Sequence, residues 1–391
     1  MNGDIMNVYV IGGGASGMVA AIVSKRLGNN VTIIEKNNNL GKKLLLTGNG
    51  RCNYFNDNMS LDNYYNDSEV DRFINKANLD KVTNFFDSIG LFPRIKDGLY
   101  YPYSNTAYAV QSSLTKEINL LGINIINEEV TDIKKEDKFI INNKYTCDKV
   151  ILSTGGITMP KTGSDGFGYK LLAKLGHHII EPKEALVGLK TDENVKDWSG
   201  IRANVEVSLY VDNDLKGIQT GEIQLTEYGI SGICVMNLSR YVKTNNYVTI
   251  NFIKDIDNLY EFINERNNKL PERTIIELLE MLVNYKLLYF ILKKLHINPD
   301  TKWNELNDNS KRDLVKYLTS YKLNIIGTRG LEYGEVTTGG VSLDEVKDNC
   351  ESKLIKNLFI TGELLNIDGI CGGYNLTNAW ITGILAGEAN D

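Results

Sequence analysis

Closely spaced glycines near the start of the chain could hold the pyrophosphate of a dinucleotide. They lie between an apolar run at residues 7–11 and a run of small and apolar residues at 18–27. In such a strand–turn–helix, one glycine permits the tight turn, a second lets the backbone approach the phosphates, and a third lets the helix lie close to the strand. The helix N-terminus would then stabilise the negative charge. The candidate residues are Gly12, Gly14, Ala15, Ser16 and Gly17.

An acidic residue follows at the distance that a dinucleotide fold needs. A second apolar run, residues 31–34, ends in Glu35, 18 positions after Gly17, and Lys36 comes next. A carboxylate at this strand end accepts hydrogen bonds from ribose hydroxyls and disfavours a 2'-phosphate. We therefore predict a dinucleotide-binding unit, with Glu35 and Lys36 among its cofactor-binding residues.

The segment after Lys36 favours FAD over a nicotinamide nucleotide. Residues 37–53 form a long glycine-punctuated stretch, where a nicotinamide dehydrogenase would continue with strands and helices. Glycines allow close backbone approach, and cations suit a pyrophosphate or the electron-rich pyrimidine side of a flavin. A solvated basic loop is the alternative. The candidate cofactor-binding residues here are Lys42, Lys43, Gly48, Gly50, Arg51, Cys52 and Asn53.

Two distant segments also look like strand ends that meet the cofactor. Runs at residues 149–152 and 357–361 lead into glycine-containing turns, and a glycine pair precedes a predicted helix that begins near residue 375. The positive end of that helix would stabilise negative charge on the N1–C2=O edge of reduced flavin. A plain C-terminal packing helix is the alternative. Further candidate cofactor-binding residues are Val130, Thr154, Gly155, Gly156, Gly362, Glu363, Gly372, Gly373, Tyr374 and Asn375.

Together these motifs resemble the BaiN-like, aminoacetone-oxidase-like family of flavoproteins. The likeness runs nearly end to end, and its most specific part is Gly-Arg-Cys-Asn at 50–53 combined with Gly-Gly-Tyr-Asn-Leu at 372–376. The resemblance implies non-covalent FAD, a three-part architecture and redox chemistry on a small organic substrate. The chain departs from the family at Asn49, Cys371 and Glu227, where Gly, Thr and His are common.

The elements that must position these residues predict an α/β fold. We expect a two-part FAD-binding Rossmann-type domain with an inserted antiparallel β-barrel-like unit and a helical cap. The first part of the FAD-binding domain is placed at residues 1–184, the β-unit at 185–258, the helical unit at 259–322 and the second part at 323–391. Period-two alternation at residues 205–211, 221–225 and 247–252 predicts strands of the β-unit.

Helical character appears in two inserted stretches. Residues 63–88 are mostly helical in character, and a second stretch runs from 270 to 295 with Pro271 at a first-turn position. The helical character continues through residues 301–318, and residues 321–327 are expected to return to the cofactor domain. The apolar face of the second stretch consists of Ile275, Leu278, Leu279, Leu282 and Leu292.

Composition limits the partners. The chain of 391 residues has a formal net charge of -6, which leaves no strong positive field for nucleic acid. Five scattered cysteines without a C-x-x-C pair suit a reducing compartment, and the adjacent His177 and His178 seldom bind one metal. No apolar run approaches the ~20 residues of a membrane helix, and residues 1–4 do not resemble a signal peptide. We expect a cytoplasmic protein without metal, membrane or nucleic-acid partners, and the sequence leaves its oligomeric state open.

The candidate catalytic residues are Tyr101, Tyr103 and Arg51. A tyrosine could donate a proton to a carbon next to a carbonyl while flavin N5 delivers hydride to the other carbon. In the first hypothesis, NADH or NADPH reduces FAD, which then reduces an activated C=C bond in a small, steroid- or bile-acid-like substrate, as the family resemblance implies. The segment 163–168 does not match a second glycine fingerprint, so a nicotinamide would dock transiently.

Two alternatives stay open. In one, the enzyme oxidises an amine such as aminoacetone and passes the electrons to oxygen. In the other, the chain is a tRNA-associated flavoprotein, which its acidic balance disfavours.

Overall fold

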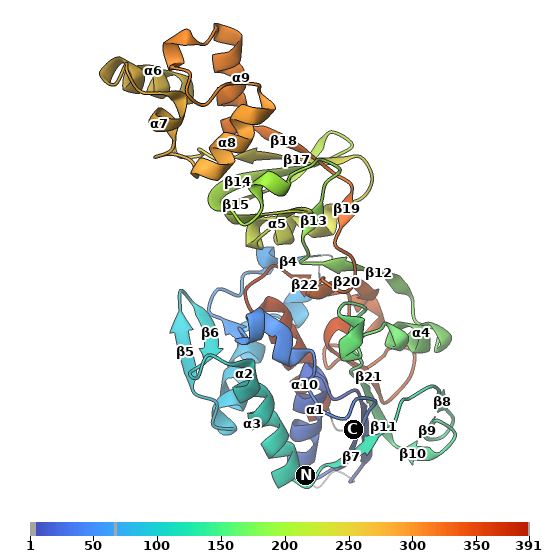
Figure 1. The fold of residues 1–391 in the computed structure, drawn as a ribbon. Coiled ribbons are helices and arrows are strands. Elements are labelled where there is room, and N and C mark those ends of the chain that lie inside the picture. Colours follow the sequence, from blue (N-terminus) through green and yellow to red (C-terminus); the bar gives the residue numbers. More distant parts are fainter. Residues whose placement is uncertain (1–4, 66–68, 390–391) are drawn as a thin grey trace. The chain divides into compact units, whose positions relative to one another are not determined.

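The structure is a computed structural model that describes residues 5–65 and 69–389. A five-stranded parallel sheet lies in the part of the chain that is predicted to bind the cofactor (Figure 1). The strand order reverses at the first strand, which has its successor on one side and strands from later in the chain on the other. Open α/β sheets bind ligands outside the carboxyl ends of the strands at such a reversal. In spatial order the strands are β21 (Leu358–Ile360), β11 (Lys149–Leu152), β1 (Asn7–Ile11), β2 (Asn30–Glu35) and β7 (Asn124–Asn127).

The two ends of the chain pack together beside this sheet. Helix α1 (Ala15–Arg26) and the C-terminal helix α10 (Tyr374–Glu388) lie side by side (Figure 1). The contact is tight because a Cβ on Gly383 would lie 2.5 Å from the carbonyl oxygen of Ser16. The predicted α/β Rossmann-type fold built from both termini is confirmed.

Three more helices and four small sheets complete this part of the chain. The helices are α2 (Lys76–Ser88), α3 (Ala107–Leu120) and α4 (Phe167–Lys174). The paired strands are β3 (Phe55–Asn56), β6 (Leu99–Pro102) and β5 (Pro93–Lys96); β22 (Asp368–Gly369) and β4 (Tyr64–Tyr65); β10 (Tyr145–Cys147), β9 (Phe139–Ile141) and β8 (Ile133–Lys135); and β12 (Ile179–Ala185) and β20 (Val336–Val341).

Contacts divide the chain into two units, each with its own hydrophobic core. Unit 1 comprises Met1–Glu184 and Gly334–Asp391, and unit 2 comprises Ala185–Tyr333. Residues 1–4, whose sequence does not resemble a signal peptide, lie outside the described residues, as do 66–68 within the stretch 63–88. In the described part of that stretch, the helical residues are the end of the short helix Leu61–Asn63, Val70–Arg72 and α2, and Tyr64 and Tyr65 instead pair with β22.

Unit 2 contains a seven-stranded sheet whose neighbouring strands all pair antiparallel, as the alternating pattern predicts. Its outer strands are β18 and β19. The order is β18 (Tyr321–Ile325), β17 (Asn246–Asn251), β14 (Arg202–Val211), β15 (Asp214–Thr226), β16 (Gly229–Ser231), β13 (Leu189–Lys190) and β19 (Gly327–Thr328). The helices are α5 (Ile233–Leu238), α6 (Leu259–Lys269), α7 (Ile275–Leu279), α8 (Tyr285–Lys294) and α9 (Asp308–Thr319).

Unit 2 differs from the sequence prediction in three ways. Its sheet and helices share one core instead of forming two separate units. The chain returns to unit 1 at Gly334 and not at residue 323, because β18 pairs with β17. The helix placed at Pro271 begins at Ile275, where Thr274 and Glu277 form a capping box, and α8 is a separate helix. Over the described ranges, no helix combines the length and the apolar character needed to cross a membrane.

Candidate functional site

Three strand ends meet at the carboxyl edge of the parallel sheet. Ser153 follows β11, Thr361 follows β21, and their hydroxyl oxygens are 2.7 Å apart. Thr361 Oγ1 also lies 3.1 Å from Ser16 Oγ in the first turn of α1. Gly12, after β1, donates its N–H to Ile34 O at 2.8 Å. Segments that are far apart in sequence therefore converge beside the first glycine turn.

The glycines of this turn have different surroundings. Gly12 has a φ of +99°, and a Cβ there would lie 2.5 Å from Ser153 O. A Cβ on Gly17 would lie only 2.0 Å from Gly12 O, whereas a Cβ on Gly14 meets no atom nearer than 3.9 Å. Gly12 and Gly17 are thus needed to build the turn, and Gly14 leaves room for a ligand. Pyrophosphate binding requires this division of roles.

The N-terminus of α1 lacks an acidic partner of its own. The N-cap residue is Gly14, which makes no side-chain cap hydrogen bond, and the described first turn holds no acidic residue. The first N–H groups of a helix have no acceptor within the helix and carry partial positive charge. The space at Gly14 and the uncapped helix end therefore fit the pyrophosphate of FAD.

Glu35 holds the turn together from the end of β2. Its Oε2 accepts the Gly13 N–H at 2.7 Å, and its Oε1 accepts the Asn37 backbone N–H at 2.8 Å and Asn37 Nδ2 at 2.7 Å. Each carboxylate oxygen has two acceptor positions. One position on Oε2 remains for a ribose hydroxyl.

Two of the predicted phosphate-binding lysines have acceptors in the protein. Lys36 Nζ lies 2.7 Å from Asp165 Oδ2, and Lys42 Nζ donates to Lys161 O at 2.7 Å. Both contacts join the loop after β2 to the segment before α4. The structure therefore gives these two cations a role in fixing the loop.

Lys43 forms an ion pair with Glu363, two predicted residues that are 320 positions apart in the chain. Lys43 Nζ lies 2.9 Å from Glu363 Oε2 and donates to Thr158 Oγ1 at 2.9 Å. Glu363 Oε1 accepts the Thr337 N–H at 3.1 Å. The pair therefore ties the glycine-rich loop to β20 and to the segment after β21.

The turn after β11 packs against β20. Gly155 has a φ of +75°, and a Cβ on Gly156 would lie 2.0 Å from Thr337 Oγ1. Thr337 Oγ1 accepts the Ile157 N–H at 2.8 Å. Gly156 thus serves close packing within the protein. Thr154 Oγ1 is buried without a hydrogen-bond partner among the described residues.

The loop at residues 48–53 adopts a left-handed backbone at several positions. Gly48, Gly50 and Cys52 have φ values of +56°, +78° and +56°, respectively. Burial raises the pKa of the Cys52 thiol to about 12, so this thiol is protonated at neutral pH. With its amide nitrogen turned toward them, Asn53 donates to the carbonyl oxygens of Phe55 and Tyr100 at 2.9 and 3.1 Å. The buried Cys52 and the hydrogen bonds of Asn53 therefore stabilise the conformation of the loop.

The N-terminus of α10 is also uncapped. Its N-cap residue Gly373 has a φ of +90°, and the described first turn contains no acidic residue. The Tyr374 hydroxyl donates to Asn58 O at 2.8 Å. The Asn375 side chain bonds both the N–H and the carbonyl of Gly369, at 2.8 and 3.0 Å. Tyr374 and Asn375 position the helix end, and the end itself carries the positive charge.

The structure separates the predicted catalytic residues into two groups. The Arg51 guanidinium carbon lies 5.8 Å from the centre of the Tyr101 ring. Tyr103 is 58% exposed and packs against Phe92 and Arg94 instead, with centres 5.5 and 5.2 Å away. Tyr101 with Arg51 is therefore the stronger candidate for proton transfer. Val130, another predicted contact, is buried in the hydrophobic core of unit 1.

Glu335 is a titratable residue near the predicted site that the sequence prediction missed. Glu335 is an exposed residue, yet surrounding protein atoms raise the pKa of its carboxyl by loss of hydration, and the charge of Lys43 partly opposes this rise. Burial, and then the charge of Glu335, raise the pKa of the Cys371 thiol. Glu335 therefore lies near two predicted cofactor loops as a second candidate proton carrier. The only signal in the sequence is an acid directly before the run Val336–Val341.

His177 has polar partners on both ring nitrogens. Its Nδ1 lies 2.7 Å from Glu345 Oε2 and its Nε2 lies 2.9 Å from Ser352 Oγ, with the imidazole fully buried. Ser352 Oγ also accepts the Leu354 and Ile355 N–H groups. The residue types match a hydrolytic triad, but burial makes the arrangement a structural clamp. Among the residues that the structure covers, no cluster of His, Cys, Asp or Glu could hold a metal.

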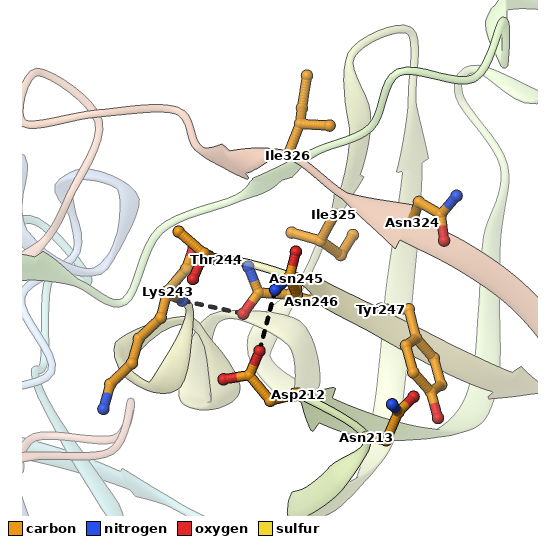
Figure 2. A pocket seen from close by; sticks show the side chains of 10 residues that line it. All are labelled: Asp212, Asn213, Lys243, Thr244, Asn245, Asn246, Tyr247, Asn324, Ile325 and Ile326. Atoms are coloured by element: carbon orange, nitrogen blue, oxygen red, sulfur yellow. Dashed lines mark hydrogen bonds between the residues drawn. The ribbon is translucent and has the colours of Figure 1, made fainter.

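A pocket of about 780 Å³ lies in unit 2, and none of the predicted site residues lines it (Figure 2). It is lined by the turn between β14 and β15, the loop before β17 and the end of β18. Asn245 Nδ2 donates to Asp212 Oδ1 at 3.1 Å, and Asn246 Oδ1 accepts the Lys243 N–H at 2.9 Å. These bonds stabilise the loop and leave no cluster of convergent charges in the pocket.

Comparison with known proteins matches the whole described chain. Residues 6–389 match the model of the HI0933-like protein Rossmann domain. A 3-dehydro-bile acid delta(4,6)-reductase from Clostridium scindens is 36% identical over 98% of this chain and 98% of its own length.

A ribosomal RNA dihydrouridine synthase from Escherichia coli is 27% identical over 96% of this chain and 95% of its own length. Among solved structures, the 3-ketosteroid delta1-dehydrogenase from Sterolibacterium denitrificans has a TM-score of 0.49 and 11% identity, with 98% of each chain covered.

Proposed function

The chain belongs to the HI0933-like family of FAD-binding Rossmann proteins, and from this premise we propose that it is an NAD(P)H-driven reductase of a C=C bond conjugated to a carbonyl. Its membership in the family makes it an FAD-dependent oxidoreductase. The proposed substrate is a small steroid- or bile-acid-like molecule. One observation carries this substrate class: the relative named for bile-acid reduction is 36% identical over 98% of both chains.

The residues of this chain would divide the work. FAD, when bound, would supply hydride transfer from N5. Gly14 and the end of α1 would bind the pyrophosphate, and Glu35 would bind the ribose. The positive end of α10 would stabilise negative charge on the flavin ring.

Tyr101 would supply the proton. Hydride addition to one carbon of a conjugated C=C bond leaves negative charge delocalised onto the carbonyl, and the carbon next to that carbonyl then takes a proton. Arg51, 5.8 Å from the ring centre, would stabilise the phenolate that remains. Residues other than Tyr101 and Arg51 would only need to hold the substrate and exclude water.

A second candidate is reduction of uracil in RNA. The relative named as a ribosomal RNA dihydrouridine synthase supports it, at 27% identity. The C5=C6 bond of uracil is also conjugated to a carbonyl, so the same hydride and proton steps would serve. The formal net charge of -6 disfavours it, because RNA binding relies on neutralising phosphates.

Anaerobic flavin reduction followed by substrate reduction tests the proposal. The FAD-loaded protein is mixed with NADH, NADPH or a primary amine while the flavin absorbance is recorded. The reduced protein is then mixed with a 3-oxo steroid carrying conjugated C=C bonds. We expect rapid bleaching by a nicotinamide nucleotide, reoxidation by the steroid and a product heavier by one hydrogen molecule.

Three other outcomes would overturn the proposal. Bleaching by the amine alone, with oxygen-dependent peroxide formation, would make the protein an amine oxidase. Reoxidation by ribosomal RNA fragments but not by the steroid, with dihydrouridine in the RNA, would favour the second candidate. Indifference to every donor would exclude both reductases.

A further inference from the structure

Arg329 lies among aromatic residues at the edge of the unit 2 sheet. It directly follows β19, and Tyr228 directly precedes β16; these two strands flank β13 in the sheet. The Arg329 N–H donates to Gly188 O at 2.9 Å. A Cβ on Gly188 would lie 2.8 Å from the Tyr228 hydroxyl oxygen and 3.3 Å from Arg329 Cδ. The missing side chain of Gly188 therefore lets arginine and tyrosine approach each other.

Two tyrosine rings hold the guanidinium. Arg329 Cζ is 4.4 Å from the centre of the Tyr228 ring and 3.6 Å from that of Tyr333. Tyr333 is fixed by its own N–H, which donates to Gly330 O at 3.1 Å. Stacking uses the flat face of a guanidinium, while its N–H donors point outward in the plane of the group. The aromatic contacts thus orient the cation and leave its donors available.

No acidic side chain neutralises this cation. In the portion of the chain that the structure describes, no carboxylate pairs with Arg329. The acids adjacent in sequence to Tyr228 and Tyr333 are Glu227 and Glu332; Glu227 is exposed, and Glu332 has an interaction of its own. An oriented arginine without a counterion matches the planar fork of a carboxylate, which it can bind through two parallel hydrogen bonds.

We propose that Arg329, held by Tyr228 and Tyr333, binds the carboxylate of an organic acid through two parallel hydrogen bonds, so that this site selects organic acids over their neutral esters. The site rests on the unpaired, ring-held cation and lies wholly within unit 2.

Binding to the oxidised, FAD-loaded protein tests the site without turnover. The probes are a 3-oxo steroid with conjugated C=C bonds and a side-chain carboxylate, and the methyl ester of the same compound. In Arg329→Met, the dissociation constant of the acid should rise about 10- to 100-fold, because a charge-assisted pair is lost. The ester should bind as it does to the unaltered protein. Arg202→Met, which removes an exposed arginine of β14 that pairs with Glu222 of β15, should change neither affinity.

A second pair of variants guards against misfolding. Arg329→Lys keeps the charge but loses the planar fork of donors, so it should weaken binding of the acid less than Arg329→Met does. Tyr333→Leu keeps the arginine but removes one ring, and it should weaken binding of the acid and not binding of the ester. Equal losses for acid and ester would show that Arg329 and the two rings merely pack the sheet, and unchanged acid binding in Arg329→Met would also overturn the proposal. If acid binding depends on Arg329 but no C=C bond is reduced, the carboxylate site stands and the proposed function fails.

Discussion

Gly14 offers a way to separate binding of the cofactor from folding of the turn. Its backbone has a φ of -78°, which alanine adopts without strain, and an added Cβ would meet no atom nearer than 3.9 Å. We expect Gly14→Ala to fold with a stability within about 0.5 kcal/mol of the unaltered apoprotein. Its FAD affinity should fall at least about 100-fold, because the methyl group occupies the pyrophosphate space. Fluorescence quenching of added FAD and urea unfolding of the apoprotein measure the two quantities.

Gly17→Ala provides the contrast. Its Cβ would lie 2.0 Å from Gly12 O, so the backbone of the turn would have to move, and both stability and FAD binding should fall together. If Gly14→Ala bound FAD as tightly as the unaltered protein, the N-terminus of α1 would not be the pyrophosphate site.

Tyr101 and Tyr103 can be distinguished by single-atom changes. Tyr101 contacts Arg51, whereas Tyr103 is exposed and makes an edge contact with Phe92. Tyr101→Phe should lower the rate of flavin reoxidation by substrate about 100-fold, the usual loss for a missing general acid, and leave flavin reduction by the nicotinamide unchanged. Stopped-flow absorbance resolves the two half-reactions.

Tyr103→Phe is the matched control, and both half-reactions should keep their rates. If Tyr101→Phe also reoxidises normally, the proton comes from another group, and Glu335→Gln becomes the variant to examine.

At the level of elements, local sequence patterns predicted the bounds of strands better than they predicted which strands pair. The runs at β1 and β11 have the predicted bounds because each is a short apolar segment that ends at a polar turn. The alternation of Tyr321, Leu323 and Ile325 indicates a strand, but only its pairing with β17 assigns it to unit 2. Pairing is a long-range property that periodicity does not encode.

The same limit applies to the site. The spacing of Gly12, Gly14 and Gly17 has a mechanical meaning that can be derived from sequence. The role of Asn375, which bonds both backbone groups of Gly369, depends on a turn that the pattern did not reveal. Glu335 could not be found because its raised pKa comes from residues brought together by folding.

The buried Lys149 joins the two sequence segments of unit 1. Lys149 Nζ donates to Ala386 O at 2.7 Å and to Ala389 O at 2.6 Å, at the C-terminus of α10. Lys149→Met keeps the aliphatic stem but leaves these carbonyls without their cationic donor, so the free energy of unfolding should fall by about 2–3 kcal/mol. Chemical denaturation followed by circular dichroism measures it.

Lys138→Met is a suitable control, because Lys138 pairs with Asp148 at an exposed position. Its loss should leave the free energy of unfolding almost unchanged, because solvent screens this ion pair. Equal effects of the two variants would mean that the contacts of Lys149 with α10 contribute little to stability.

For the whole molecule, two separate cores imply two cooperative units. The hydrophobic cluster of unit 1 shares no residue with that of unit 2. Unit 1 contains four thiols, Cys52, Cys147, Cys350 and Cys371, and unit 2 contains Cys234. Burial raises the pKa of Cys52 and Cys147 to about 12 and that of Cys234 to about 11. It also raises the pKa of Cys350 and Cys371 well above the usual range of a thiol.

These shifts predict a loss of stability at alkaline pH that differs between the units. Above a pH of about 9 the unfolded thiols lose their protons while the folded ones keep them, so the free energy of unfolding falls as the pH rises. At a pH of about 10, each thiol lowers it by about 1.4 kcal/mol. The four thiols of unit 1 should therefore lower its free energy of unfolding by about 6 kcal/mol, and the thiol of unit 2 should lower that of unit 2 by about 1.4 kcal/mol. Below a pH of about 8 these thiols should not change the free energy of unfolding of either unit.

Urea unfolding near pH 8 and near pH 10, with tryptophan fluorescence as the probe, measures the difference. Trp380 lies in the core of unit 1, and Trp198 and Trp303 lie in that of unit 2, so Trp380→Phe isolates the transition of unit 2. In a Cys234→Ala background that transition should lose about 1.4 kcal/mol less between the two pH values. Parallel losses with and without Cys234 would mean that this thiol ionises as freely in the folded unit as in the unfolded chain.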